Sequence, residues 1–188
     1  MYWDIYSTYV EDDMSEDLSN WVGLSVKNTA IFGPLTLNSD GDAGDVFLSS
    51  IEDEMDRCLM LTSSEGGGAL HVHTMSPCFA PQNDEDSSLG STTEKPGVCD
   101  SDFDCASEAN WVLNWDSTAS DYGGIFGIAR DGHVIYGPYN GDGEVWACED
   151  LDVCNGFFVD SSTGEYAYAT TTFFPYVVGC WGPVYPST

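Results

Sequence analysis

Two stretches of the chain decide the fold: Gly23-Leu-Ser-Val-Lys-Asn-Thr-Ala-Ile-Phe-Gly-Pro34 and Gly127-Ile-Ala-Arg-Asp-Gly-His-Val-Ile-Tyr-Gly-Pro138, which align without a gap 104 positions apart. Each is a run of β-forming residues that ends at a Gly-Pro pair, and such a pair stops a strand. Asn28-Thr29 in the first and Asp131-Gly132 in the second lie at the same place, and Asp-Gly is a hairpin signal because both of its residues tolerate positive φ. Each stretch therefore predicts a hairpin of two short strands.

Further blocks repeat in the same order at an offset of 96. Met55-Asp-Arg-Cys58 matches Leu151-Asp-Val-Cys154, and Gly68-Ala-Leu-His-Val-His-Thr74 matches Gly164-Glu-Tyr-Ala-Tyr-Ala-Thr170. Because chance does not order several blocks in this way, the pattern predicts an internal duplication.

We define repeat A as residues 20–80 and repeat B as residues 123–182; a cysteine, Cys78 or Cys180, ends the matched blocks of each. The expected fold is all-β with short helical segments. It consists of a duplicated β-sandwich or β-sheet unit with pseudo-two-fold symmetry, stapled by disulfides. Helical periodicity is weak and confined to 45–55.

Three segments lie outside the repeats: an N-terminal stretch at 1–19, an acidic insert rich in Ser, Thr, Gly and Pro at 81–122, and an extended tail at 183–188. The N-terminal stretch is predicted to form a strand, because its first ten residues are rich in aromatic and β-branched side chains and contain no Gly or Pro. Its apolar members are Tyr2, Trp3, Ile5, Tyr6, Tyr9 and Val10.

The composition excludes some partners. The 188 residues include 32 Asp and Glu against four Lys and Arg, for a formal net charge of −28. Such a surface repels nucleic acid and anionic lipid. No apolar run approaches the length that a spanning helix needs, so no membrane insertion is expected.

Seven cysteines without any Cys-x-x-Cys pair indicate disulfides rather than a structural zinc site, and hence an extracellular or cell-surface protein. Equivalent places in the two repeats predict the bonds Cys58–Cys78 and Cys154–Cys180, each stabilising by about 3 kcal/mol. Cys99 and Cys105 are then expected to close the acidic loop, which leaves Cys148 unpaired.

Repeat B resembles the YHYH domain family, which is named for a Tyr-His-Tyr-His strand. The resemblance rests on the stretch 127–138, on Leu151-Asp-Val-Cys-Asn-Gly156, on Tyr166-Ala-Tyr-Ala-Thr170 and on Phe174-Pro-Tyr-Val-Val-Gly-Cys180, and it covers about 23–182. It implies an exported protein and no particular activity.

The chain departs from the family at the naming strand. Repeat A has Leu70-His71-Val72-His73, and repeat B has Tyr166-Ala167-Tyr168-Ala169. If the paired histidines of the family bind a metal, the resemblance implies that only one of two sites remains.

Two kinds of ion site are candidates. His71 and His73 lie two apart in an expected strand, so both side chains leave one face and can hold a transition metal with carboxylates to complete the shell. The alternative is that they hydrogen-bond within a half-buried strand or face water. His133, in the turn of repeat B, is expected to be exposed and unrelated.

The acidic loops are the candidate calcium sites. Asp40, Asp42 and Asp45, with Asn38, form one loop, and the aspartates between Cys99 and Cys105 form another. Neither has the glycine and glutamate spacing of an EF-hand, and solvated carboxylates are the alternative.

The sequence favours a structural function. The aromatic N-terminal strand can add to the sheet edge of a neighbouring copy and so build a filament or surface assembly, or else it pairs within its own chain. Threonines and serines at 87–93 and 170–172 are candidate O-glycan sites. Catalytic motifs are absent, so we expect no enzyme and no required cofactor. The alternative is an extracellular module that binds a divalent metal or calcium.

Overall fold

The computed structural model describes residues 21–37, 43–45, 58–62, 68–76, 79 and 121–182. These residues form an eight-stranded sheet and a separate two-stranded sheet. The strands of the large sheet are β1 (Trp21–Ser25), β2 (Ala30–Phe32), β5 (Met60–Thr62), β6 (Leu70–Val72), β7 (Ile125–Ala129), β8 (Val134–Tyr136), β9 (Gly156–Asp160) and β10 (Glu165–Ala169). The small sheet pairs β3 (Leu35–Leu37) with β4 (Ala43–Asp45), and two 3-10 helices lie at Asp121–Gly123 and Cys148–Asp150. The predicted all-β class is confirmed.

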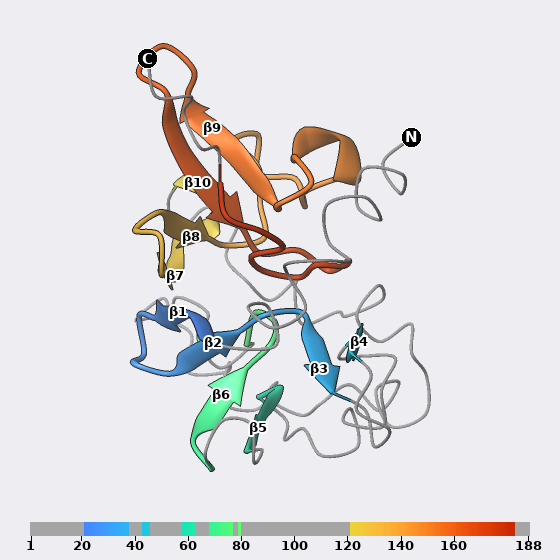
Figure 1. The fold of residues 1–188 in the computed structure, drawn as a ribbon. Coiled ribbons are helices and arrows are strands. Elements are labelled where there is room, and N and C mark those ends of the chain that lie inside the picture. The colour runs from blue at the N-terminus through green and yellow to red at the C-terminus, as the bar shows by residue number, and fades with distance from the viewer. Residues whose placement is uncertain are drawn as a thin grey trace.

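The large sheet has the order β5-β6-β2-β1-β7-β8-β10-β9. Strands of repeat A make up one half of it and strands of repeat B the other, as the change from blue and green to yellow and red shows (Figure 1). In each half, an antiparallel hairpin (β1–β2 or β7–β8) pairs in parallel with the next strand (β6 or β10). The outermost strand (β5 or β9) then adds antiparallel. Read outward from the centre, the two halves have the same topology.

The register is matched as well. The offset of 104 carries the bounds of β1 and β2 onto those of β7 and β8. The parallel pair Ile31–Val72 of repeat A becomes the pair Ile135–Tyr168 of repeat B under the two offsets. This agreement supports an internal duplication, while the pseudo-two-fold symmetry stays a prediction.

The hairpin turns explain why each stretch reverses direction. Asn28 and Gly132 occupy equivalent positions and have φ values of 62° and 93°. Their backbone N–H groups donate to Ser25 O and Ala129 O, both at 2.9 Å. Asparagine and glycine adopt this conformation at low cost. The two predicted hairpins are confirmed.

The two halves meet where β1 pairs antiparallel with β7, and Leu24 lies opposite Ile128. The backbones approach closely on either side of this pair. A Cβ on Gly127 would lie 2.6 Å from Leu24 O, and one on Gly23 would lie 2.7 Å from Ile128 O. Glycine is therefore required at both positions.

We expect Gly127→Ala to lower the free energy of unfolding by about 2 kcal/mol, because the new methyl group meets a backbone carbonyl that cannot rotate away. Urea denaturation measures this change. Gly141→Ala is the control, since its Cβ would meet only Tyr122 Cε1 at 3.7 Å, an ordinary contact. Equal stabilities of the two variants would contradict the close approach of β1 and β7.

The main hydrophobic core draws on both repeats. Its fully buried members include Val22, Ile31, Val72, Phe126, Ile135 and Tyr168. A second cluster lies within repeat B and consists of Trp146, Leu151, Phe157, Ala167 and Ala169. A helix long and apolar enough to cross a bilayer does not occur in the described ranges.

Candidate functional site

Two groups of side chains lie on the third strand of each half or directly after it. Strand β10 carries Tyr166 and Tyr168, whereas β6 carries His71 and is followed by His73. We call Tyr166, Tyr168 and the side chains that contact them the tyrosine cluster, and His71 with His73 the histidine pair.

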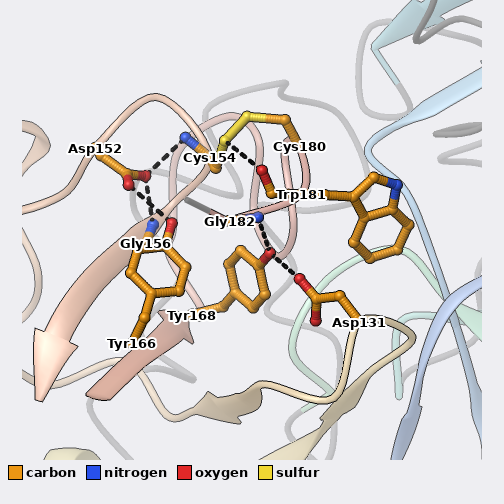
Figure 2. The surroundings of a disulfide bond; sticks show 9 residues. All are labelled: Asp131, Asp152, Cys154, Gly156, Tyr166, Tyr168, Cys180, Trp181 and Gly182. Atoms are coloured by element: carbon orange, nitrogen blue, oxygen red, sulfur yellow. Dashed lines mark hydrogen bonds between the residues drawn. A yellow bond between two sulfur atoms is a disulfide. The ribbon is translucent and has the colours of Figure 1, made fainter. Parts of the chain in front are cut away.

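The tyrosines of β10 bind two aspartates beside the disulfide (Figure 2). Tyr168 Oη donates to Asp131 Oδ2 at 2.5 Å and accepts the N–H of Gly182 at 2.5 Å. Tyr166 Oη donates to Asp152 Oδ2 at 2.8 Å. The phenols thus connect the hairpin turn of repeat B and the following loop to the C-terminal segment.

Asp152 shapes the loop that presents Cys154. Its Oδ1 accepts the backbone N–H groups of Cys154 and Gly156 at 2.8 and 2.9 Å, as an aspartate does in a turn built on its own side chain. Cys154 bonds to Cys180 with a Cα–Cα distance of 4.5 Å (Figure 2). The predicted Cys154–Cys180 disulfide is confirmed.

The electrostatics keep both phenols of this cluster neutral near neutral pH. Burial raises the pKa of both Tyr166 and Tyr168, and the adjacent carboxylates raise it further. Partial burial acts to raise the pKa of Asp131, but the hydrogen bonds from Tyr168 and His133 outweigh it and hold the pKa below its usual value. Neutral phenols that donate hydrogen bonds to carboxylates hold the surrounding loops to β10.

His133 belongs to this cluster, which sequence reasoning missed. It is half-buried rather than exposed, and its ring lies edge-on to Tyr166 and Tyr168, with centroids 5.2 and 5.9 Å away. Its Nδ1 is 3.1 Å from Asp131 Oδ2. The only sequence signal was its place two residues after Asp131 in the turn.

The histidines of repeat A are fully enclosed. His71 is 0% exposed and His73 is 1% exposed, and their ring centroids are 5.1 Å apart. Phe32 of the neighbouring β2 stacks on His71 at 4.2 Å and meets His73 edge-on at 5.9 Å. Both imidazoles hydrogen-bond within the fold, as the alternative to a metal site predicted, but they are fully buried rather than half-buried or facing water.

Each of the two imidazoles has its proton position fixed by a backbone carbonyl. His71 Nδ1 lies 2.9 Å from Ala69 O and His73 Nδ1 lies 2.6 Å from Gly33 O. A carbonyl oxygen can only accept, so Nδ1 carries the proton in both rings and Nε2 carries the lone pair. Burial lowers the pKa of His73 to about 4, the nearby His71 adds to this effect, and the hydrogen bond to Gly33 opposes it.

Repeat B fills the equivalent space differently. Ala167 and Ala169 stand where repeat A has His71 and His73, and both are buried. The indole of Trp146 occupies the same cluster and donates through Nε1 to Gly137 O at 3.2 Å. Gly137 is the counterpart of Gly33, so a tryptophan makes the hydrogen bond that a histidine makes in repeat A.

The remaining predicted site residues divide into three groups. The first group lies outside the described residues and comprises Asp40 and Asp42, Cys78, Cys99 and Cys105, the predicted N-terminal strand, and the serines and threonines at 87–93. Asp45 ends strand β4, opposite Leu35. Cys58 is disulfide-bonded, and Cys148 is an exposed free thiol, as predicted.

The proposed O-glycan sites at Thr170 and Thr171 are wrong. Both residues are 0% exposed. Thr170 Oγ1 donates to Met75 Sδ at 3.2 Å, and Thr171 Oγ1 donates to Phe173 O at 2.7 Å and accepts from Asn155. A glycan would require these hydroxyls to leave the core.

Comparisons with known proteins give no further assignment, since no family model, curated protein or solved structure matches the chain.

Proposed function

We propose that the chain is a non-enzymatic extracellular structural protein that assembles with copies of itself by strand addition. The N-terminal strand of one copy (Tyr2–Val10) adds to the open edge of the sheet of the next copy. The Cys154–Cys180 disulfide and the disulfide at Cys58 support an oxidising compartment.

The open edge of β9 is the observation that carries the proposal. β9 is the last strand of the large sheet, and no other strand of the described ranges pairs with its outer side. Its sequence Gly-Phe-Phe-Val-Asp has one charged residue, at its end, although acidic residues are abundant elsewhere. Phe158 is 49% exposed on it. Proteins normally protect such an edge with charges, so an uncharged aromatic edge is typical of a strand acceptor.

The N-terminal strand fits this edge by chemistry. It is the most apolar segment outside the repeats, with Asp4 as its only charge in the first ten residues, and ten further residues precede Trp21. Addition of one copy's strand to the next copy's edge does not close into a ring by itself, so it gives a filament.

The test compares two matched lysine variants and one truncation by sedimentation velocity and electron microscopy. We expect Phe158→Lys and deletion of residues 1–12 each to leave folded monomers, because a charge on the edge opposes pairing and the donor is lost. Ile128→Lys is the control: it changes a side chain that is 55% exposed at the centre of the sheet rather than at its edge. Assembly that survives Phe158→Lys, or that Ile128→Lys abolishes instead, would overturn strand addition at β9.

A further inference from the structure

The histidine pair of repeat A presents two imidazole lone pairs inside the protein. With Nδ1–H committed to Ala69 O and Gly33 O, the Nε2 atoms of His71 and His73 are the acceptors of the pair. His71 Nε2 is buried and has no hydrogen-bond partner within the part of the chain that the structure describes. A buried acceptor without a partner costs about 1–3 kcal/mol, so its retention calls for a ligand.

Repeat B fills the equivalent region without histidines. At the equivalent positions Ala167 and Ala169 leave room that Trp146 fills, and the carbonyl of Gly137 still receives its hydrogen bond. An aromatic side chain therefore fills this space and satisfies the carbonyl of Gly137 in repeat B. Repeat A has two nitrogen lone pairs in addition, on imidazole rings whose orientation is fixed by hydrogen bonds from Nδ1. Metal-binding histidines are usually held by such a hydrogen bond from the other ring nitrogen.

The surroundings of the pair decide which metal fits. Among the described residues, no group of three or more His, Cys, Asp or Glu side chains comes together, and the neighbouring ring is that of Phe32. Zinc in a structural site takes about four ligands, and calcium takes several oxygen ligands. Burying the double charge of either ion beside two neutral rings would also be costly. A monovalent ion bears half that charge, and imidazole is a ligand that suits copper.

We propose that His71 and His73 bind Cu(I) through their Nε2 atoms. The two imidazoles are the ligands, the carbonyls of Ala69 and Gly33 fix their orientation, and Phe32 shields the ion from water. The site is independent of strand addition at β9, because β5 and β6 lie at the opposite end of the sheet from β9.

The test uses the full chain in a Cys148→Ser background, since the exposed thiol of Cys148 is itself a soft ligand. Anaerobic competition against bicinchoninate measures Cu(I) affinity and stoichiometry. We expect a single Cu(I) per chain, unchanged by His133→Gln and weakened more than about 100-fold by His71→Gln or His73→Gln, since even supporting groups around a metal contribute up to that factor. Binding that both glutamine variants retain would overturn the proposal, as would absence of binding in the background protein.

A second measurement needs no variant at the site. Addition of Ag(I), a redox-inert ion that shares the d¹⁰ electron count of Cu(I), is expected to shift the ¹⁵N resonances of the two Nε2 atoms while Nδ1 keeps its proton. Unshifted Nε2 resonances at one equivalent of Ag(I) would contradict coordination even if the glutamine variants failed to fold.

Discussion

Replacing Cys154 and Cys180 together with alanine is expected to lower the free energy of unfolding by roughly 3–4 kcal/mol. The two cysteines are 26 positions apart, and cross-linking them removes the entropy of that loop from the unfolded chain. In the folded protein the bond holds the segment that follows Cys180 against the loop of Asp152, so that the N–H of Gly182 reaches Tyr168 Oη. Urea denaturation with tryptophan fluorescence measures the loss.

The exposed free thiol of Cys148 supplies the matched control for this prediction. Cys148→Ser is expected to change stability by less than about 0.5 kcal/mol, because a surface substitution away from packing or bonding has a small effect. Equal effects of the two replacements would show that the disulfide does not constrain repeat B.

The hairpins were predictable because their signals are local. Turn residues and β-forming runs lie within a dozen positions, and the repeated blocks fixed which strands correspond. The details of backbone conformation were less accessible. Leu59 and its counterpart Asn155 both have positive φ, at 57° and 67°. Asparagine often adopts positive φ and so makes it predictable from the sequence, whereas leucine does not.

The contacts of the tyrosine cluster were not predictable, since they join residues distant in sequence. Tyr168 and Asp131 are 37 positions apart and meet only because β10 pairs in parallel with β8, at the end of the hairpin that carries Asp131. The error at Thr170 has the same origin. A run of threonines indicates an exposed, modifiable segment by composition, but the continuation of β10 carries these residues into the core.

The spacing of two identified the histidine pair in the sequence. The complete burial of both rings could not be predicted from that spacing. Two further facts needed the structure: the carbonyl partners that fix the ring protons, and Trp146 as the substitute in repeat B. Trp146 lies in the stretch between β8 and β9, where the two repeats have no matched block, so alignment of the repeats could not pair it with His73.

Acidification is expected to destabilise the metal-free protein through His73. Burial lowers its pKa from 6.5 to about 4, so the unfolded chain binds a proton more readily than the folded chain. The stability that the neutral ring provides is complete above the unfolded pKa of 6.5 and is lost as the pH falls toward 4. The loss amounts to roughly 2 kcal/mol at pH 5 and roughly 3 kcal/mol at pH 4.

Protonation of the many carboxylates also changes the free energy of unfolding at low pH, because it reduces their mutual repulsion. The contribution of His73 must be separated from this change. The measured quantity is therefore the stability of the wild type minus that of His73→Gln, determined by urea denaturation with a chelator present at pH 7, 5 and 4. This difference is expected to shrink by the stated amounts as the pH falls, because glutamine has no proton to bind. Gly141→Ala retains all three histidines and is expected to follow the wild type at each pH. A constant difference between wild type and His73→Gln would mean that the ring of His73 is hydrated or charged in the folded protein, contrary to its burial against Phe32 and Gly33.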